Sequence, residues 1–254
     1  MYRSLTSSVL MASMLGACAT QPATSPGDVY DPFEPVNRQV FAFNEAADKA
    51  VLGPVSDAYV TITPEFARIG IGNFLSNLSS PVVFVNDVLQ GEGQRATDTA
   101  FRFVINSTFG IGGLLDPAEH ELGVEKHRED FGQTLGVWGV SSGPYLVIPL
   151  LGPTNLRDGI GMGVDTAIDP MTWIEFDDPD LDDQIALTRG ILGGLEARAA
   201  LDDELETLRA QPEPYVALRR AYSSAREAAI RNGREDADPY TDLPDFDDFD
   251  DFEE

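Results

Sequence analysis

The chain has 254 residues, with 43 acidic and 17 basic side chains and a formal net charge of −26. Because DNA and RNA are polyanions bound through Lys and Arg, this balance argues against nucleic acid as a partner. Cys18 is the only cysteine, which excludes an intramolecular disulfide. A chain of this length forms one large domain or two small ones and can bury a core without covalent links.

The N-terminus reads as a leader that lies outside the fold. Arg3 precedes a short apolar run over 5–15, and Leu15-Gly-Ala-Cys18 matches the lipobox of bacterial lipoproteins. Such a small-residue site is cleaved, and the cysteine sulfur is acylated. We therefore predict a signal peptide over 1–17, lipidation of Cys18 and a lipidated tether over 18–30. Ala19, in place of the Asp that retains many lipoproteins at the inner membrane, points to the outer membrane. The alternative is a cleaved secretory signal with an incidental cysteine.

Helical spacing begins after the tether. Apolar residues at 36, 40, 43, 47 and 51 predict an amphipathic helix that ends at Gly53-Pro54. A second segment should run to about Ile62. Pro81 interrupts the next uncharged region, which predicts two half-length helices over 64–78 and 81–89.

A polar stripe crosses the helix predicted over 97–109. Asp98, Arg102 and Asn106 follow one another at four-residue spacing, while the rest of this helix is apolar nearly all round. Such a stripe must face a partner, an interior or a water-filled cavity. The three residues are candidates for lining a polar path, and the alternative is a single buried ion pair in a soluble protein.

The stretch 131–156 carries no charge and contains five Gly and three Pro. These residues exclude a simple membrane-spanning helix. Val137-Trp138 and Tyr145–Ile148 flank Ser141–Pro144, a pattern that predicts a short β-hairpin or looped arm. A buried hairpin in an ordinary soluble core is the alternative.

The C-terminal third contains further helical patterns. Residues 154–169 fit either a closely packed helix or a loop, residues 181–208 fit a helix weakened at Gly193-Gly194, and residues 215–231 fit a helix stopped at Asn232-Gly233. Basic residues of the last helix are candidates for contact with a partner or anionic lipid, the alternative being a solvated helix face: Arg219, Arg220 and Arg226. The acidic tail, 234–254, with its Asp-Phe repeats, is predicted to be disordered; docking to a basic partner is the other reading.

The sequence offers little catalytic chemistry. Gly139–Gly143 matches the G-x-S-x-G elbow of α/β hydrolases, which requires a strand before it, a helix after it and a later histidine. Both histidines, His120 and His127, precede Ser141, so no base follows it. Spacings for a transition metal, calcium or a phosphate loop are also missing from the sequence. We predict no cofactor, no metal site and no enzyme activity.

Several motifs together resemble the MlaA/VacJ family of outer-membrane lipoproteins. They occur in family order over about 31–233, and the acidic tail lies beyond them. The motifs are Asp31-Pro-Phe-Glu-Pro-Val-Asn-Arg38, Phe41-Ala-Phe-Asn44, Asn73-Phe-Leu-Ser-Asn-Leu78, Asn86-Asp-Val-Leu-Gln-Gly91, Arg102-Phe-Val-Ile-Asn106, Gly110-Ile-Gly-Gly-Leu-Leu-Asp116, Phe131-Gly-Gln-Thr-Leu-Gly136, Gly143-Pro-Tyr-Leu-Val-Ile-Pro149 and Gly152-Pro-Thr-Asn-Leu-Arg-Asp158.

The resemblance implies a mainly α fold, in which a ring-like bundle of short amphipathic helices lies in the outer membrane with a small hairpin insert. It implies an amphipathic channel that removes mislocalised phospholipids from the outer leaflet and maintains lipid asymmetry. The implied partners are phospholipids, a periplasmic shuttle of the MlaC type and a trimeric outer-membrane porin.

The resemblance also suggests roles for particular residues. The region 131–149 corresponds to a hairpin gate, and Phe43 with Asn44 falls in a segment that restrains lipid flow. The candidate gate residues are Phe131, Trp138, Gly139, Gly143 and Tyr145. Two other functions remain open: a scaffold lipoprotein that moves no lipid, and a lipid hydrolase that uses Ser141.

Overall fold

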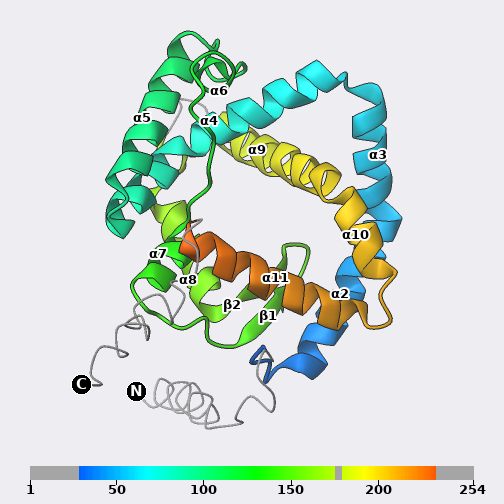
Figure 1. Cartoon of the computed structure of the whole chain (residues 1–254). Coiled ribbons are helices and arrows are strands. Elements are labelled where there is room, and N and C mark those ends of the chain that lie inside the picture. Colours follow the sequence, from blue (N-terminus) through cyan, green and yellow to red (C-terminus); the bar gives the residue numbers. More distant parts are fainter. Residues whose placement is uncertain (1–28, 175–178, 233–254) are drawn as a thin grey trace, which may run out of the picture.

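The computed structural model describes residues 29–174 and 179–232, which form helices and one two-stranded hairpin (Figure 1). The predicted signal peptide, the lipidated Cys18, the tether up to residue 28 and the acidic tail lie outside the described residues. Within them the mainly α prediction is confirmed.

The first helical segment does not end at Gly53, as the sequence suggested. Helix α2 (Glu34–Ala47) continues through a π-helical turn, η2 (Asp48–Leu52), into α3 (Gly53–Ile62). The backbone N–H of Gly53 reaches back five residues to the carbonyl of Asp48. This wider turn places Pro54 in the first turn of α3, where its missing N–H costs little.

The predicted break at Pro81 is wrong. Helix α4 (Glu65–Gln90) passes through Pro81 and ends at Gly91, which has φ 78°. The hydroxyls of Ser79 and Ser80 donate to carbonyls one turn earlier, at 3.1 and 3.3 Å. Helix α4 also packs against α5 (Gly93–Thr108). Tertiary contact of this kind outweighs the roughly 3 kcal/mol that an internal proline costs.

The hairpin exists, and one of its strands is the predicted Tyr145–Ile148, but the other is not Val137-Trp138. Strand β1 (Tyr145–Ile148) pairs antiparallel with β2 (Gly152–Asn155), so the turn lies at 149–151. Residues 131–137 instead form helix α7 (Phe131–Val137), with Trp138 as its C-cap. Asp130 starts this helix as its N-cap, because its carboxylate accepts from the backbone N–H of Gln133. A short helix, α6 (Pro117–His120), lies earlier in the chain.

The remaining helices complete the ring. They are α8 (Leu156–Ile168), the 3₁₀ turn η3 (Pro170–Thr172), α9 (Pro179–Ala200), α10 (Asp202–Arg209) and α11 (Pro214–Arg231). The stretch 154–169, which the sequence left open, is mostly helix. The single helix predicted over 181–208 is wrong in one respect: it is interrupted at Leu201, between α9 and α10, while α9 passes through Gly193-Gly194. Asn232, with φ 52°, ends α11 as expected.

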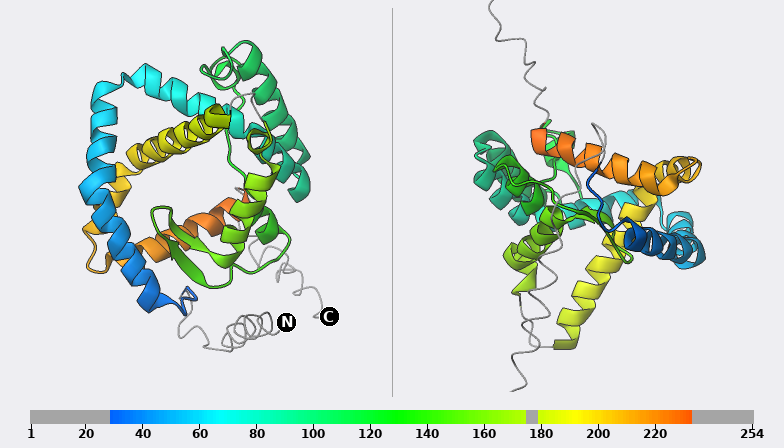
Figure 2. Two further views of the ribbon diagram at one scale, coloured as in Figure 1. Left: turned by 180° about the vertical axis from the view of Figure 1, so that it is seen from behind. Right: turned by 90° about the horizontal axis from the view of Figure 1, so that it is seen from below.

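These elements surround a central opening, so the ring-like prediction is confirmed. Helices α2, α3 and α4 follow one edge, α7, α8, the hairpin and α11 form the opposite part, and α9 with α10 crosses between them (Figure 1). Seen edge-on, α11 lies on one face, while α8 and α9 project from the other (Figure 2). A small core of Tyr145, Val147 and Tyr215 packs between β1 and α11.

Candidate functional site

The ring has an inverted distribution of side chains. Among the described residues, 18 polar or charged residues are buried, against six hydrophobic ones, and 36 large hydrophobic side chains are exposed. Ile62, Phe66 and Phe109 are each more than 70% exposed. Large exposed apolar surface marks contact with a membrane, a ligand or another protein. Within residues 29–174 and 179–232, no helix is long and apolar enough to cross a bilayer.

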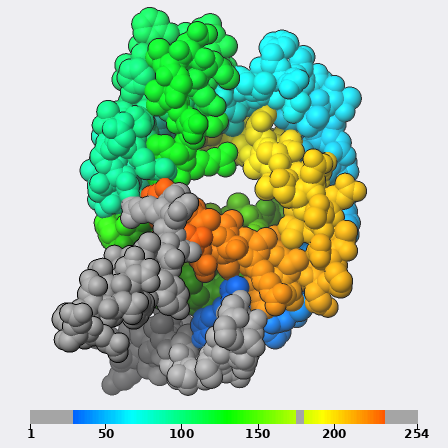
Figure 3. Space-filling model, in the orientation of Figure 1, coloured from blue at the N-terminus to red at the C-terminus, as the bar shows by residue number. Residues whose placement is uncertain are grey.

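The centre of the ring is open. The space-filling view shows background between α9 and α11, so side chains do not close the gap between the ribbons (Figure 3). A cavity of about 570 Å³ adjoins the inner side of α9. Its apolar lining comes from Phe41, Val51, Leu52, Val55, Val147, Leu150, Leu151, Pro153, Ile191, Leu195, Leu201, Leu205, Leu208, Pro214 and Leu218.

A charged cluster closes one side of this cavity. Asp48 receives Arg198 Nε at 2.7 Å and Arg209 Nη2 at 2.6 Å, and Arg209 Nε also lies 3.0 Å from Glu45. Burial alone would raise the pKa of Asp48, but the two guanidinium groups hold that pKa below its usual value. The cavity therefore has an apolar body and one edge that carries both signs of charge.

Two asparagines of α2 hold the hairpin against the inside of the ring. Asn37 donates to the carbonyl of Tyr145 and accepts from the N–H of Val147, both at 3.0 Å. One end of the turn is held in the same way: Asn44 donates to the carbonyl of Ile148 at 3.0 Å and accepts from the N–H of Leu150 at 2.8 Å. The two amides act as an extra strand along the edge of β1.

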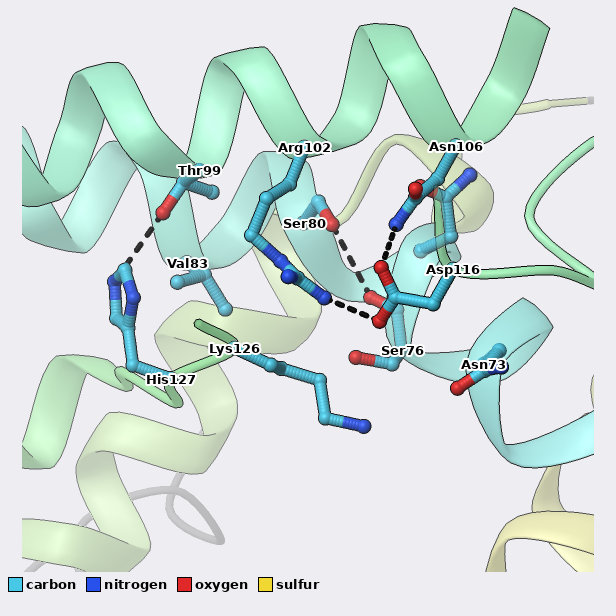
Figure 4. A pocket seen from close by; sticks show the side chains of 11 residues that line it. Asn73, Ser76, Ser80, Val83, Thr99, Arg102, Asn106, Asp116, Lys126 and His127 are labelled. Atoms are coloured by element: carbon cyan, nitrogen blue, oxygen red, sulfur yellow. Dashed lines mark hydrogen bonds and ion pairs between the residues drawn. The ribbon is translucent and has the colours of Figure 1, made fainter. Parts of the chain in front are cut away.

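Two residues of the α5 stripe, Arg102 and Asn106, face Asp116, the N-cap residue of α6. Arg102 Nη2 lies 2.5 Å from Asp116, and Asn106 Nδ2 lies 2.8 Å from the other oxygen of that carboxylate (Figure 4). They border a polar pocket of about 30 Å³, which is the size of a water molecule. Asp98 lies outside this group and accepts instead from Gln94, at 2.9 Å. Whether any of the three lines a lipid path stays a prediction.

A second buried group beside this pocket was missed by sequence reasoning. Asp87 is fully buried in α4, where it accepts from Thr99 at 2.7 Å and lies 3.0 Å from His127 Nε2. Thr99, one turn before Arg102, is the inward-facing position that Asp98 was expected to fill. Asp98 and Thr99 are only 100° apart around the helix axis. The sequence pattern could therefore not decide which of the two faces the protein interior.

The contact between α7, α8 and α11 contains a dense ionic cluster. Arg226 forms a bidentate pair with Asp130 at 2.7 and 2.8 Å and donates to Asp158 at 2.8 Å. Tyr222 donates to Asp158 at 2.5 Å, and Arg157 donates to it at 3.0 Å. Burial would raise the pKa of both carboxyl groups, but Arg226 together with the other hydrogen-bond donors around them lowers both pKa values.

The basic residues predicted to meet a partner divide into two groups. Arg226 lies in the cluster just described, and Arg219 is 9% exposed and pairs with Asp31 at 2.9 Å. Arg219 and Arg226 therefore form ion pairs within the ring. Arg220 is exposed on α11, and its contact with a partner stays a prediction.

The candidate gate residues lie in three different places. Phe131 and Trp138 pack edge to face, 5.9 Å apart between ring centroids, at the two ends of α7. Gly139 and Gly143 bound the loop before β1 with φ 85° and 68°, and of the five residues only Tyr145 belongs to the hairpin. Their assignment to one hairpin is therefore wrong, because α7 takes up the first half of the segment. Their role as a gate stays a prediction.

The surroundings of Ser141 do not form a nucleophile elbow. Helix α7 precedes this residue and strand β1 follows it, which reverses the required strand–turn–helix order. His127, one of the two histidines, lies against Asp87 in the pocket between α4 and α5.

A family model described as MlaA lipoprotein matches residues 29–229. The chain belongs to the MlaA lipoprotein family. Relatives named intermembrane phospholipid transport system lipoprotein MlaA are similar over 91% of this chain: the Escherichia coli protein is 34% identical over 90% of its length, and the Haemophilus influenzae protein is 31% identical over 92%. An uncharacterised Rickettsia felis protein is 36% identical over 80% of this chain and 79% of its own.

A solved structure supports the same assignment. It is described as the structural basis for maintenance of bacterial outer membrane lipid asymmetry, and it aligns with a TM-score of 0.70 at 34% identity, over 79% of this chain and 98% of that one. The likeness therefore covers nearly the whole of that solved chain.

Proposed function

We propose that this protein removes mislocalised phospholipids from the outer leaflet of the outer membrane and passes them through the ring to a periplasmic shuttle. The observation that carries the proposal is the inverted ring, whose surface is rich in apolar side chains and whose centre is open. The names of the relatives, which refer to intermembrane phospholipid transport, agree with it. Such a channel maintains lipid asymmetry and needs no energy source of its own.

The exposed apolar side chains support a position within the inner part of the membrane. Ile62, Phe66 and Phe109 would each lose water on contact with acyl chains, and burial of apolar surface contributes about 25 cal/mol per Å². Because helices satisfy their own backbone hydrogen bonds, they can lie in the bilayer without crossing it. We propose that acylation of Cys18 anchors the chain from the periplasmic side.

The hairpin is the part of the ring best placed to restrain flow. Its turn, 149–151, contributes two residues to the wall of the cavity, Leu150 and Leu151. Asn44 forms hydrogen bonds to the backbone on both sides of Pro149, while its neighbour Phe43 is 53% exposed. We propose that this bond fixes the aperture. Loss of Phe43 and Asn44 would then release the hairpin.

We propose two protein partners, and membership of the MlaA lipoprotein family supports both. A periplasmic shuttle of the MlaC type would accept the lipid and give the transport its direction. A trimeric porin would hold the ring in the membrane through part of the exposed apolar surface. Arg220 on α11 is a candidate contact for either partner.

The test is the amount of phospholipid in the outer leaflet of intact cells, with and without this gene. We expect a rise on deletion that the intact protein reverses. Ser141→Ala should reverse it equally well, because the described surroundings of Ser141 lack the elbow. Cys18→Ala should fail to reverse it when the protein no longer reaches the outer membrane. An unchanged outer leaflet would overturn the transport proposal in favour of a scaffold.

A further inference from the structure

Helix α9 is held in the ring with little help from buried side chains. None of its residues 180–200 is buried, whereas the shorter helix α5 buries four residues. Leu187 and Ile191 of α9 are 64% and 52% exposed. Its N-terminal part projects from one face of the ring (Figure 2). Because the packing of an apolar face normally fixes a helix in place, α9 is held less firmly than α5.

The C-terminal end of α9 is tied to its neighbours by polar bonds. Glu196 accepts a hydrogen bond from the hydroxyl of Tyr59 on α3. Arg198 Nε lies 2.7 Å from Asp48 in the π-helical turn between α2 and α3. These contacts connect the last two turns of α9 to the edge of the ring, so this end of the helix is its fixed end.

Two consecutive glycines separate the fixed end from the rest of α9. Gly193 and Gly194 lie just before the tied turns, and a Cβ atom added to either would meet nothing within 4 Å. Glycine has the greatest backbone freedom of any residue, and sharp bends in helices occur at such small-residue pairs. The open space around the pair leaves room for the helix to bend there.

An ion pair joins the projecting part of α9 to the end of α8. Arg189 Nη1 lies 2.7 Å from Asp169, and the two side chains are 27% and 13% exposed. A pair that is partly open to water contributes little net stability, so it can break and form again. It has the properties of a latch between the two helices.

Helix α9 is also the wall between two cavities. On one side lies the ring cavity of about 570 Å³, and on the other lies a cleft of about 720 Å³ between α8 and α9. Ser79 and Val82 of α4 line the cleft, and Gly190 lines both spaces. A sideways movement of this part of α9 therefore enlarges one space at the expense of the other.

We infer that residues 180–192 form a hinged arm, which turns about Gly193-Gly194 when Arg189 leaves Asp169 and so changes the width of the ring cavity. Hinges of this kind need only a few residues that absorb the change in backbone angles. The arm couples the two spaces, because a molecule that enters the cleft would favour the narrower ring cavity. This movement is a property of the ring itself and does not depend on the proposed transport.

The test is a pair of distance measurements on the full lipidated protein in phospholipid nanodiscs. Spin labels are placed on Leu187→Cys in the arm and Val104→Cys on α5, or on Ala200→Cys at the fixed end and Val104→Cys. All three positions are exposed. Cys18 is the only natural cysteine, and mass spectrometry checks that it carries no label. We expect pulsed electron spin resonance to give a distance distribution about twice as wide for the arm as for the fixed end.

Variants of the hinge and of the latch should change the arm in opposite directions. Gly193→Ala combined with Gly194→Ala should narrow the arm distribution about twofold, because alanine stiffens a helix and the site has room for it. Arg189→Met should widen the distribution by about half. The matched control is Gly159→Ala with Gly163→Ala in α8, where added Cβ atoms also meet nothing within 4 Å. It should leave both distributions unchanged.

Equal widths for the arm and the fixed end would overturn the inference. It would also be overturned if the α9 alanines left the arm unchanged, or if the α8 alanines narrowed it equally. Asp169→Asn removes the latch from the other side and can still accept from the N–H of Met171, so it replaces Arg189→Met if that variant loses helix content. An unchanged arm after loss of the latch would contradict its role. The proposed function is judged separately, by the outer leaflet after gene deletion.

Discussion

Glycine has opposite roles where α7 meets α8 and along α9. Where α7 meets α8, a Cβ atom on Gly161 would lie 2.4 Å from the backbone nitrogen of Gly132. Along α9, a Cβ atom on Gly190 or Gly194 would meet nothing within 4 Å. Glycine at the first place permits contact between helices, and glycine at the second keeps a space open. The ring therefore combines a closely packed junction with a hollow wall.

Ionic groups differ in the same way between these regions. At the junction, Arg226 joins Asp130 and Asp158 on two other helices, with Asp158 almost fully buried. Beside the hollow wall, Arg209 reaches Glu45 and Asp48 while its own side chain is 26% exposed. Asp158 holds the junction from a buried position, although Asp130 is 36% exposed, and Arg209 at the cavity edge stays partly exposed.

The largest effect is expected at the junction cluster. Arg226→Met keeps much of the side-chain volume but leaves Asp130 without a guanidinium partner and Asp158 with Arg157 alone. Breaking a buried pair in this way costs about 3–5 kcal/mol of unfolding free energy. The measurement is chemical unfolding in detergent. Arg38→Met is the control, because its pair with Glu34 is about 40% exposed and should contribute at most about 1 kcal/mol. Equal losses in both variants would contradict the distinction.

A smaller loss is expected from closing the gap between α7 and α8. Gly161→Ala forces the two backbones apart and should lower the unfolding free energy by about 1–3 kcal/mol. Gly163→Ala, two residues away, has open space and should instead stabilise α8 by about 0.5–1 kcal/mol. Thermal unfolding of both variants gives the comparison. A change of the same sign in both would show that the junction is not closely packed.

The hairpin provides an intermediate case. Asn44→Ala removes the partners of the Ile148 carbonyl and the Leu150 N–H, and should cost about 1–2 kcal/mol of local stability. Hydrogen–deuterium exchange at Leu150 should become faster, with a parallel change in outer-leaflet phospholipid. Gln94→Ala, which removes one exposed hydrogen bond to Asp98, is the control. An unchanged exchange rate at Leu150 would show that Asn44 does not hold the hairpin turn and so does not restrain lipid flow.

The smallest effect is a change in pH dependence. Burial tends to raise the pKa values of Asp130 and Asp158, but hydrogen bonds from Arg226 and other donors hold both pKa values below normal. The two carboxylates therefore stabilise the fold fully above the unfolded pKa of about 3.9, and this stabilisation declines as the pH falls through their folded pKa values. Burial raises the pKa values of Glu129 and Asp165, which gives the opposite slope at higher pH. Stability should therefore be greatest at mildly acidic pH. Arg226→Met should weaken the loss of unfolding free energy at acidic pH, as measured by unfolding over a series of pH values. The same pH dependence in the variant and the natural protein would contradict this.

Three elements show how much of the secondary structure could be predicted from the sequence. Helix α11 and its stop at Asn232 followed from apolar spacing and a residue that tolerates positive φ. The hairpin was placed one strand too early, because Val137-Trp138 has strand-forming residues although the cap at Asp130 starts a helix. Pro81 was expected to divide α4, but packing against α5 outweighs a local preference that the sequence alone expresses.

By itself, the sequence determined the mainly α class and the family motifs, because these depend on local spacing and residue chemistry. Only the tertiary structure decided which side of each helix faces inward. It paired Arg102 with Asp116 and not Asp98, placed Arg226 among acids from two distant helices, and opened a cavity beside Gly194. The physical reason is that apolar side chains remain on the outside of this ring. The usual rule that apolar periodicity marks the buried face therefore fails, and contacts between distant polar residues select the interior.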